Sequence, residues 1–153
     1  MNLLIRRRGF TLLELLIVFS VLSILASIAL PKFSDMLLKA QEGTLKGDLG
    51  AMRTALSLYY NDNQGNYPSC SAGPNSGVLA KALVPAYMVS IPIVNNGLHP
   101  PTNSVYCDAL MLPGDVHDGQ GWYYDGVALD SQNGGIWVAC DHTDTTGTNW
   151  SSY

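Results

Sequence analysis

The chain has 153 residues, a length that suits one modest domain together with a membrane segment. Charged residues make up 13% of the chain, well below the roughly 25% of a typical soluble protein. The formal net charge is −4, and an acidic chain has no general affinity for nucleic-acid phosphates, so no nucleic-acid partner is expected.

An apolar run from Phe10 to Leu30 dominates the first part of the chain, and Glu14 is the only ionisable residue inside it. A helix of roughly 20 apolar residues crosses a bilayer core, so the run predicts a membrane span. A buried helix of a soluble domain rarely stays apolar on every face for so long. A secretory signal is the stronger alternative, because three arginines (6–8) precede the run. The run is longer than the usual signal, however, and Pro31 ends it instead of a small-residue cleavage site.

Glu14 indicates that the apolar run is more than a membrane anchor. A carboxylate within a membrane span costs several kcal/mol unless it is paired or lies near the interface, so an acid there usually has a role. If the chain were cut after Gly9, Phe10 would carry a new α-amino group one helical turn from Glu14. The same amine on one subunit could also pair with Glu14 of a neighbour in an assembly.

The string Arg8-Gly9-Phe10-Thr11-Leu12-Leu13-Glu14-Leu15-Leu16-Ile17-Val18 resembles the class III signal of type IV pilins and type II secretion pseudopilins. The resemblance implies that a membrane prepilin peptidase cuts between Gly9 and Phe10 and methylates the new Phe10 amine. It implies that Glu14 is the family's acid, which pairs with a neighbour's N-terminus during filament assembly. Pro31 matches the family's kink proline in the first helix.

The helix is expected to continue past the apolar run. From Lys32 to about Asn61, apolar residues recur at spacings of three to five, close to the helical period. The chain then divides into a leader peptide (1–9), a transmembrane or filament-core half of the helix (10–30) and a pilin-like outer domain (31–153). One long helix would therefore belong half to lipid and half to a domain.

Three glycines in the second half of this helix, Gly43, Gly47 and Gly50, are spaced so that they share one face. Each costs roughly 1 kcal/mol relative to Ala in a helix interior, so the face should have a use. Either the domain packs closely against it, or it serves contact between helices, or bending, in a filament.

The rest of the chain predicts a small domain. A short helix is expected at Val78–Tyr87, then an irregular connection over 88–120 with a short strand around Ser104–Cys107. Gly121–Asp125 and Gly135–Cys140 are rich in aromatic and β-branched residues and should pair as antiparallel strands. The expected fold class is α+β and pilin-like, with one long N-terminal helix packed against a small antiparallel sheet.

The chain has three cysteines, Cys70, Cys107 and Cys140, and an exported domain would form one disulfide and keep one thiol. The favoured pair is Cys107 with Cys140, because both lie at or beside predicted strands; Cys70 with either of them is the alternative. The cysteines and histidines (His99, His117, His142) have no ligand-like spacing, so no metal site is expected from them.

Aspartates are frequent in the last third of the chain, and calcium takes six to eight oxygen ligands that such loops could supply. Major pseudopilins are known for a calcium site in this region, but no EF-hand spacing is present, and solvated turn residues are the favoured interpretation. The aspartates are Asp115, Asp118, Asp125, Asp130, Asp141 and Asp144. Since no nucleophile elbow, phosphate loop or paired-acid motif occurs, no enzyme activity is expected.

The favoured function is that of a precursor of a type II secretion pseudopilus subunit, or of a related type IV pilus-like filament. The alternative is a type IV pilin or minor pilin for adhesion, motility or DNA uptake. The expected partners are copies of the same chain, a prepilin peptidase and an inner-membrane assembly platform. The chain would first span the inner membrane once, with its C-terminal domain in the periplasm.

Overall fold

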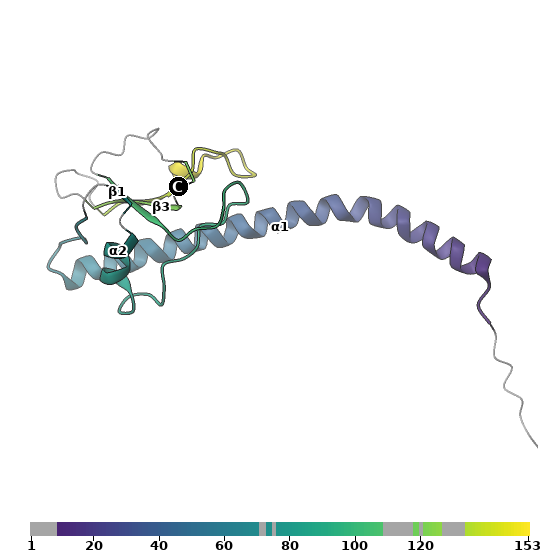
Figure 1. The fold of residues 1–153 in the computed structure, drawn as a ribbon, viewed down its shortest axis with the longest axis horizontal. Helices are drawn as coiled ribbons and strands as arrows, with labels where there is room; N and C mark the ends of the chain where they lie inside the picture. The colour runs from purple at the N-terminus through teal and green to yellow at the C-terminus, as the bar shows by residue number, and fades with distance from the viewer. Residues whose placement is uncertain (1–8, 71–72, 75, 109–117, 120, 127–133) are drawn as a thin grey trace, which may run out of the picture. The chain divides into compact units, whose positions relative to one another are not determined.

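The structure is a computed structural model, and it describes residues 9–70, 73–74, 76–108, 118–119, 121–126 and 134–153. Two compact units are distinguished, residues 1–37 and residues 38–153. The α+β class is confirmed. The elements in chain order are α1 (Leu12–Asp62), β1 (Gly73–Pro74), α2 (Ser76–Leu83), β2 (Val105–Asp108), β3 (Gly121–Asp125), β4 (Ile136–Ala139) and the 3-10 helix η1 (Trp150–Ser152) (Figure 1).

Helix α1 is continuous over 51 residues and passes through Pro31 without a break, so the prediction of one long helix ending near Asn61 is confirmed. Its C-terminal end is closed by turn residues. The Asn63 side-chain amide donates to the Tyr59 carbonyl at 2.8 Å, and Gly65, with φ +81°, donates its backbone N–H to the Tyr60 carbonyl at 2.9 Å. A left-handed glycine just past a helix is a common way to satisfy its last carbonyls.

Helix α2 begins two residues earlier than expected and ends at Leu83 instead of Tyr87. The physical reason for the early end is Pro85. The residue before a proline is pushed out of the helical region by the proline ring, so Val84 cannot extend the helix by another turn.

The sheet has four strands in the order β1-β2-β3-β4. The expected antiparallel pairing of the two aromatic strands is confirmed, with Tyr123 opposite Trp137 in β3 and β4. The expectation of a wholly antiparallel sheet is wrong, because β2 runs parallel to β3, with Tyr106 opposite Tyr123. Twelve residues separate β2 from β3 in the sequence, enough for the crossover that a parallel pair requires.

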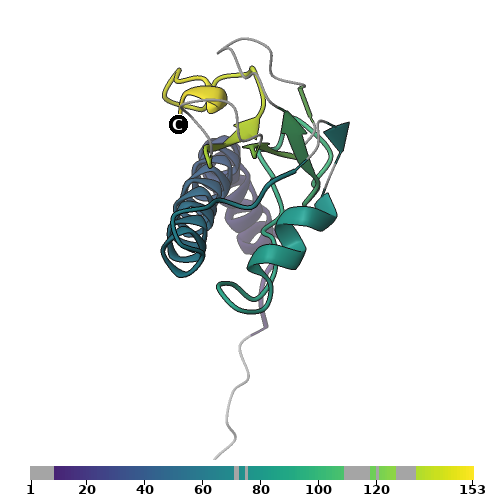
Figure 2. The same cartoon turned by 90° about the vertical axis from the view of Figure 1, so that its left-hand side faces the viewer.

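The core of the second unit lies between the sheet, α2 and one face of α1 (Figure 2). That face of α1 carries Leu45, Leu49, Met52, Ala55 and Leu56, all buried. Strand β3 is buried along its whole length and has a neighbouring strand on each side. Its polar ring atoms still find partners: Trp122 Nε1 donates to the Pro92 carbonyl and the Tyr124 hydroxyl to the Pro68 carbonyl, each at 2.8 Å. Both aromatic side chains therefore belong to the buried core.

The disulfide joins Cys70 to Cys107, so the favoured pairing of Cys107 with Cys140 is wrong. Cys107 lies on β2 and Cys140 directly follows β4, and β3 lies between these strands. Two strand spacings amount to about 9.6 Å, beyond the Cα separation of up to about 6.8 Å that a disulfide spans. Cys70 instead lies just before β1, the other neighbour of β2, and its Cα is 6.3 Å from that of Cys107.

Cys140 remains a buried free thiol, and burial raises its pKa to about 11. We therefore expect one thiol per chain to react with a maleimide before reduction, and only after unfolding, while three react after reduction. Mass spectrometry of the labelled chain checks this, with Cys140→Ser as the control that removes the single early label. Labelling at Cys70 or Cys107 before reduction would contradict the pairing.

Because the bridge closes 37 residues, Cys70→Ser should cost about 4 kcal/mol of unfolding free energy.

Candidate functional site

The processing motif directly precedes the first turn of α1. Phe10 is 68% exposed, and Thr11 caps the helix by accepting the backbone N–H of Glu14 on its hydroxyl oxygen at 3.2 Å. Thr11 and Glu14 thus have the spacing of a capping box. A new amine at Phe10 would lie at the positive end of the helix dipole, where a cation is disfavoured and an acid is favoured. Glu14 is positioned to compensate for that amine.

Every residue from 9 to 41 is exposed in the single chain, and this stretch contains most of the large apolar side chains of α1. Within the described ranges of the chain, one helix, α1, is long and apolar enough to cross a membrane by length and composition. Soluble monomers rarely expose contiguous apolar patches above a few hundred Å². The first half of α1 therefore needs lipid or neighbouring chains around it.

The serine hydroxyls in this half of α1 donate hydrogen bonds to backbone carbonyls of the same helix. The hydroxyls of Ser20, Ser23 and Ser27 donate to the carbonyls of residues 17, 19 and 24 at 2.7 to 2.8 Å. Hydroxyls bonded to their own helix leave no unsatisfied donor in an apolar surrounding. Glu14 is different, because no residue that the structure describes pairs with its carboxylate.

The glycine face of α1 is open. Gly43, Gly47 and Gly50 are exposed, and a Cβ placed on any of them would meet no atom within 4 Å. The alternative that the domain packs closely on these glycines is therefore wrong. Helical geometry gives the reason: at 100° per residue they lie about 160° from the stripe through Leu45 and Leu49 that the domain covers.

A second edge of α1 holds the C-terminal segment. Glu42, Lys46 and Arg53 lie along this edge and bind Thr145, Asp144 and Tyr153; we refer to these six residues as the tail clamp. The Glu42 carboxylate accepts the backbone N–H of Thr145 at 2.8 Å and also its hydroxyl. Arg53 donates to the Tyr153 carbonyl and to the Ile136 carbonyl of β4.

Asp144 is the centre of the tail clamp, and its side chain is fully buried. Oδ2 lies 2.6 Å from Lys46 Nζ and accepts the Tyr153 hydroxyl at 2.6 Å, while Oδ1 accepts bonds from Thr146 and Thr148. The Lys46 ammonium and the Tyr153 hydroxyl hold the pKa of the Asp144 carboxyl well below its usual range. The same contacts raise the pKa of Lys46, with Asp144 as the largest cause.

The aspartates considered for calcium do not gather into one site among the residues that the structure describes. Asp144 is held by Lys46, whereas Asp118 lies beside His99 and His142. Asp141 contacts His142 at 3.2 Å, and Asp125 is buried at the end of β3. Asp115 and Asp130 lie outside the described residues, as does His117, so the absence of a cofactor stays a prediction and calcium binding stays its less favoured alternative.

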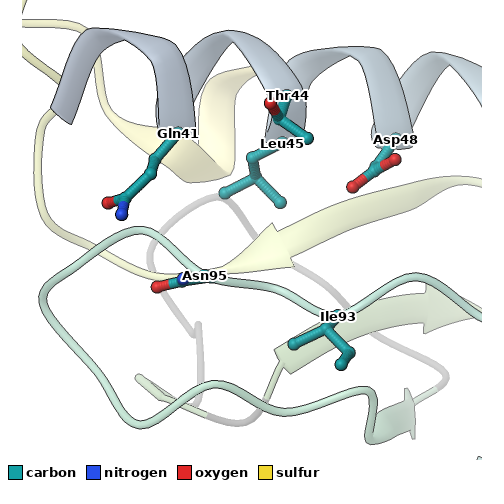
Figure 3. A pocket seen from close by; sticks show the side chains of 6 residues that line it. All are labelled: Gln41, Thr44, Leu45, Asp48, Ile93 and Asn95. Carbon is teal, nitrogen blue, oxygen red and sulfur yellow. The ribbon is translucent and has the colours of Figure 1, made fainter. Parts of the chain in front are cut away.

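The fold does assemble one group of potential metal ligands that sequence spacing did not reveal: His99, Asp118, Cys140 and His142. The only local signal is the Cys140-x-His142 spacing, since the other two members come from distant segments. A separate shallow cleft lies between α1 and the segment containing Ile93 and Asn95 (Figure 3). Among the residues lining it, Asp48 is the only ionisable one, which gives the cleft no pair of groups for acid–base chemistry.

The other residues that the sequence analysis predicted to have a role fall in separate places. Gly9 and Phe10 precede α1, Glu14 lies in its first turn, and Pro31 lies inside the continuous helix. Cleavage at Gly9, assembly through Glu14 and the kink at Pro31 stay predictions. Sequence reasoning missed the tail clamp, although Glu42, Lys46 and Arg53 share one helix edge at spacings of four and seven.

Comparison with known proteins gives two kinds of match. The family model described as the prokaryotic N-terminal methylation motif matches residues 4–30. Type II secretion system core protein G of Escherichia coli K12 is 36% identical over 80 residues, which cover 52% of this chain and 54% of that protein. The protein of the same name from Klebsiella pneumoniae is 38% identical over 80 residues, covering 52% and 56%.

The type IV major alpha-pilin of Moraxella bovis is 46% identical over 50 residues, which cover 33% of this chain and 31% of that pilin. The chain thus spans about half the length of the secretion proteins that it matches and about a third of this pilin. No solved structure matches the chain.

Proposed function

We propose that the chain is the precursor of a type II secretion pseudopilus subunit or of a subunit of a related pilus-like filament. The chain belongs to the family of type IV pilins and type II secretion pseudopilins, whose members are structural filament subunits and not enzymes. In this proposal a prepilin peptidase removes residues 1–9 and methylates Phe10. The mature chain then assembles through its N-terminal helix with other copies of itself.

One observation carries the proposal: residues 10–30 are apolar and exposed, and because their serines bond within the helix, Glu14 is the one polar group of this stretch without a partner among the described residues. A plain membrane anchor has no use for an acid at that place, since the carboxylate costs free energy in lipid. A filament core has a use for it, because the amine of a neighbouring chain can neutralise the acid in an apolar surrounding.

The open glycine face supports the same proposal. In an exposed helix interior a glycine only weakens the helix, so three on one uncovered face favour an approach by another backbone. We assign this face to contact with a neighbouring subunit's helix. Before assembly the chain spans the inner membrane once through residues 10–30, with its C-terminal domain in the periplasm, and an inner-membrane assembly platform moves it into the filament.

The second candidate is a type IV pilin, or a minor pilin for adhesion, motility or DNA uptake. The observation that favours it is the higher identity to the Moraxella bovis pilin, but that similarity covers only a third of this chain. The similarity to core protein G extends over 80 residues and so reaches into the outer domain. Neighbouring genes separate the two: a retraction ATPase favours the pilus, and secretion-specific components favour the pseudopilus.

The test is mass spectrometry of the chain isolated from membranes of a host that has prepilin peptidase. We expect an N-terminus at Phe10 that carries one methyl group. Gly9→Ala should reduce cleavage strongly, whereas Gly43→Ala, in the open glycine face, should leave cleavage unchanged because a Cβ there meets no atom. An N-terminus at Met1, or cleavage elsewhere, would refute the filament function.

A further inference from the structure

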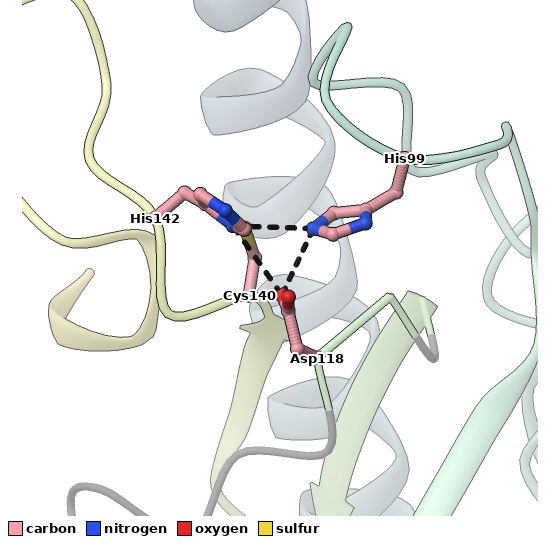
Figure 4. Close-up of side chains that lie close together, drawn as sticks. All are labelled: His99, Asp118, Cys140 and His142. Carbon is pink, nitrogen blue, oxygen red and sulfur yellow. Dashed lines mark hydrogen bonds and ion pairs between the residues drawn. The ribbon is translucent and has the colours of Figure 1, made fainter.

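We propose that His99, Asp118, Cys140 and His142 bind a zinc ion in the outer domain (Figure 4). The four side chains come from three segments: the connection before β2, the two residues that the structure describes ahead of β3, and the chain that leaves β4. Their ligand atoms lie within 4.8 Å of one another. This site is independent of the filament function and of the processing motif.

Four of the six distances between the donor atoms are close to the edges of a small tetrahedron, and the other two, from Cys140 Sγ to His99 and to Asp118, are within 4.8 Å. His99 Nε2 lies 3.3 Å from His142 Nδ1 and 2.9 Å from Asp118 Oδ1. His142 Nδ1 lies 3.5 Å from Asp118 Oδ1 and 3.6 Å from Cys140 Sγ. A tetrahedral zinc ion with Zn–N near 2.0 Å and Zn–S near 2.3 Å has ligand-to-ligand edges of about 3.3 to 3.6 Å. An ion at the common centre therefore needs only small movements.

The donor chemistry selects zinc over calcium. Two imidazole nitrogens, a thiolate sulfur and one carboxylate oxygen suit a borderline-soft ion in tetrahedral geometry, whereas calcium takes six to eight oxygens. When the ion binds, the Cys140 S–H bond breaks, a Zn–S bond forms, and the proton leaves to solvent. Four protein ligands close the coordination sphere, so the site is structural and not catalytic.

Residues around the cluster hold its ligands in place. The buried Asn96 accepts the backbone N–H of His99 on Oδ1 at 3.2 Å, and its Nδ2 donates to Cys140 Sγ at 3.2 Å. One amide therefore positions two ligands and provides a hydrogen bond to the thiolate. Such second contacts typically change metal affinity by roughly 10- to 100-fold.

Gly119 joins Asp118 to the other ligands. Its backbone N–H donates to the Ala139 carbonyl at 3.0 Å, which places Asp118 beside the end of β4. Its φ of +80° is left-handed, and a Cβ there would come within 3.2 Å of His99 Nδ1. A residue with a side chain at this position would both strain the backbone and displace the His99 ring.

A metal-free hydrogen-bond cluster is the competing explanation, because Asp118 could accept protons from both imidazoles. It gives the Cys140 sulfur only weak hydrogen bonds, because a neutral thiol is a weak donor and a weak acceptor, whereas a bound zinc ion would give the sulfur a strong bond. Asp141 Oδ1, 3.2 Å from His142 Nδ1, lies at the exposed rim and could bind His142 in the absence of an ion. Measurement of the zinc content of the chain distinguishes the zinc site from a metal-free hydrogen-bond cluster.

The test uses the full chain purified in detergent, stripped with a chelator, and equilibrated with zinc chloride. We expect one zinc per chain by elemental analysis and a higher melting temperature with zinc than without. Cys140→Ser and Asp118→Ala should each weaken zinc binding by at least 100-fold, and Asn96→Ala by about 10- to 100-fold. Asp48→Asn, an acid in the separate cleft, is the matched control and should bind zinc as the unmodified chain does.

Cobalt(II) tests the geometry in the unmodified chain itself. In the unmodified chain it should give the spectrum of a tetrahedral site with a thiolate charge-transfer band, and that band should disappear in Cys140→Ser. Retention of no zinc by the unmodified chain, or equal retention by the Cys140→Ser and Asp118→Ala variants, would overturn the proposal. So would binding of calcium with no zinc bound at equal concentration, because calcium prefers six to eight oxygen ligands.

Discussion

Replacement of Glu14 by Ala is expected to leave membrane insertion intact and to reduce filament assembly at least tenfold. The variant removes the only acid of the apolar half of α1 and so leaves each Phe10 amine without its partner in the filament core. An unpaired charge in an apolar surrounding costs several kcal/mol, and each 1.4 kcal/mol corresponds to about tenfold in an equilibrium. Sheared filaments and the membrane fraction can be quantified from the same cells by immunoblotting.

Two control variants isolate the charge. Glu14→Gln keeps the size of the side chain and should assemble as poorly as Glu14→Ala. Ser27→Ala removes a hydroxyl that bonds only to the Ile24 carbonyl of its own helix, and it should assemble normally. Normal filaments from Glu14→Gln would refute the pairing with the Phe10 amine.

Replacement of Asp144 by Asn is expected to lower the melting temperature of the outer domain by about 5 to 10 °C. Asn can still accept the bonds that Oδ1 receives from Thr146 and Thr148. Its amide nitrogen would, however, face the Lys46 ammonium, which is a donor only, so the ion pair would be lost and two donors would meet. Differential scanning calorimetry of the full chain in detergent measures the shift.

Controls for Asp144→Asn come from the same helix and the same clamp. Asp48→Asn, whose carboxylate forms no ion pair within the described part of the chain, should shift the melting temperature by less than about 2 °C. Lys46→Met should destabilise the domain as Asp144→Asn does, and the double variant should lose less than the sum because the two residues act as one unit. Additive losses would contradict the clamp.

The pH dependence of the clamp has a definite sign. The pKa of Asp144 is lowered in the folded chain, so its contribution is complete above its unfolded pKa of about 3.9 and is lost as pH falls through the lower folded value. The pKa of Lys46 is raised, so its contribution is complete below about 10.5 and is lost at higher pH. The melting temperature of the unmodified chain should therefore fall more steeply below pH 4 than that of Asp144→Asn.

Local patterns predicted the elements that depend on local rules. The length of α1 follows from an apolar run joined to a helical stripe, and the pairing of β3 with β4 follows from two aromatic segments separated by turn residues. The openness of the glycine face was also available from the sequence. Gly43, Gly47 and Gly50 lie opposite the Leu45–Leu56 stripe on a helical wheel, so a domain that covers one leaves the other bare.

Features that depend on the order of strands could not be predicted in the same way. Strand direction is not encoded in the β propensity of Ser104–Cys107, so the parallel pairing of β2 with β3 was missed, and with it the reason why Cys107 cannot reach Cys140. The four potential zinc ligands converge because Asn96 and Gly119 fix two loops against the end of β4. These contacts join residues that are far apart in the sequence, so no short sequence motif contains both partners of a contact.

The self-bonded serines of α1 bear on how a subunit could leave the bilayer. A helix whose polar groups were bonded to lipid headgroups or to water would have to break those bonds on extraction, and each would add to the barrier. Ser20, Ser23 and Ser27 keep their bonds to residues 17, 19 and 24 in either surrounding, so they add nothing to it. In the proposed filament, extraction would then be opposed mainly by the loss of lipid contacts and favoured by the pairing of Glu14 with a neighbour's Phe10 amine.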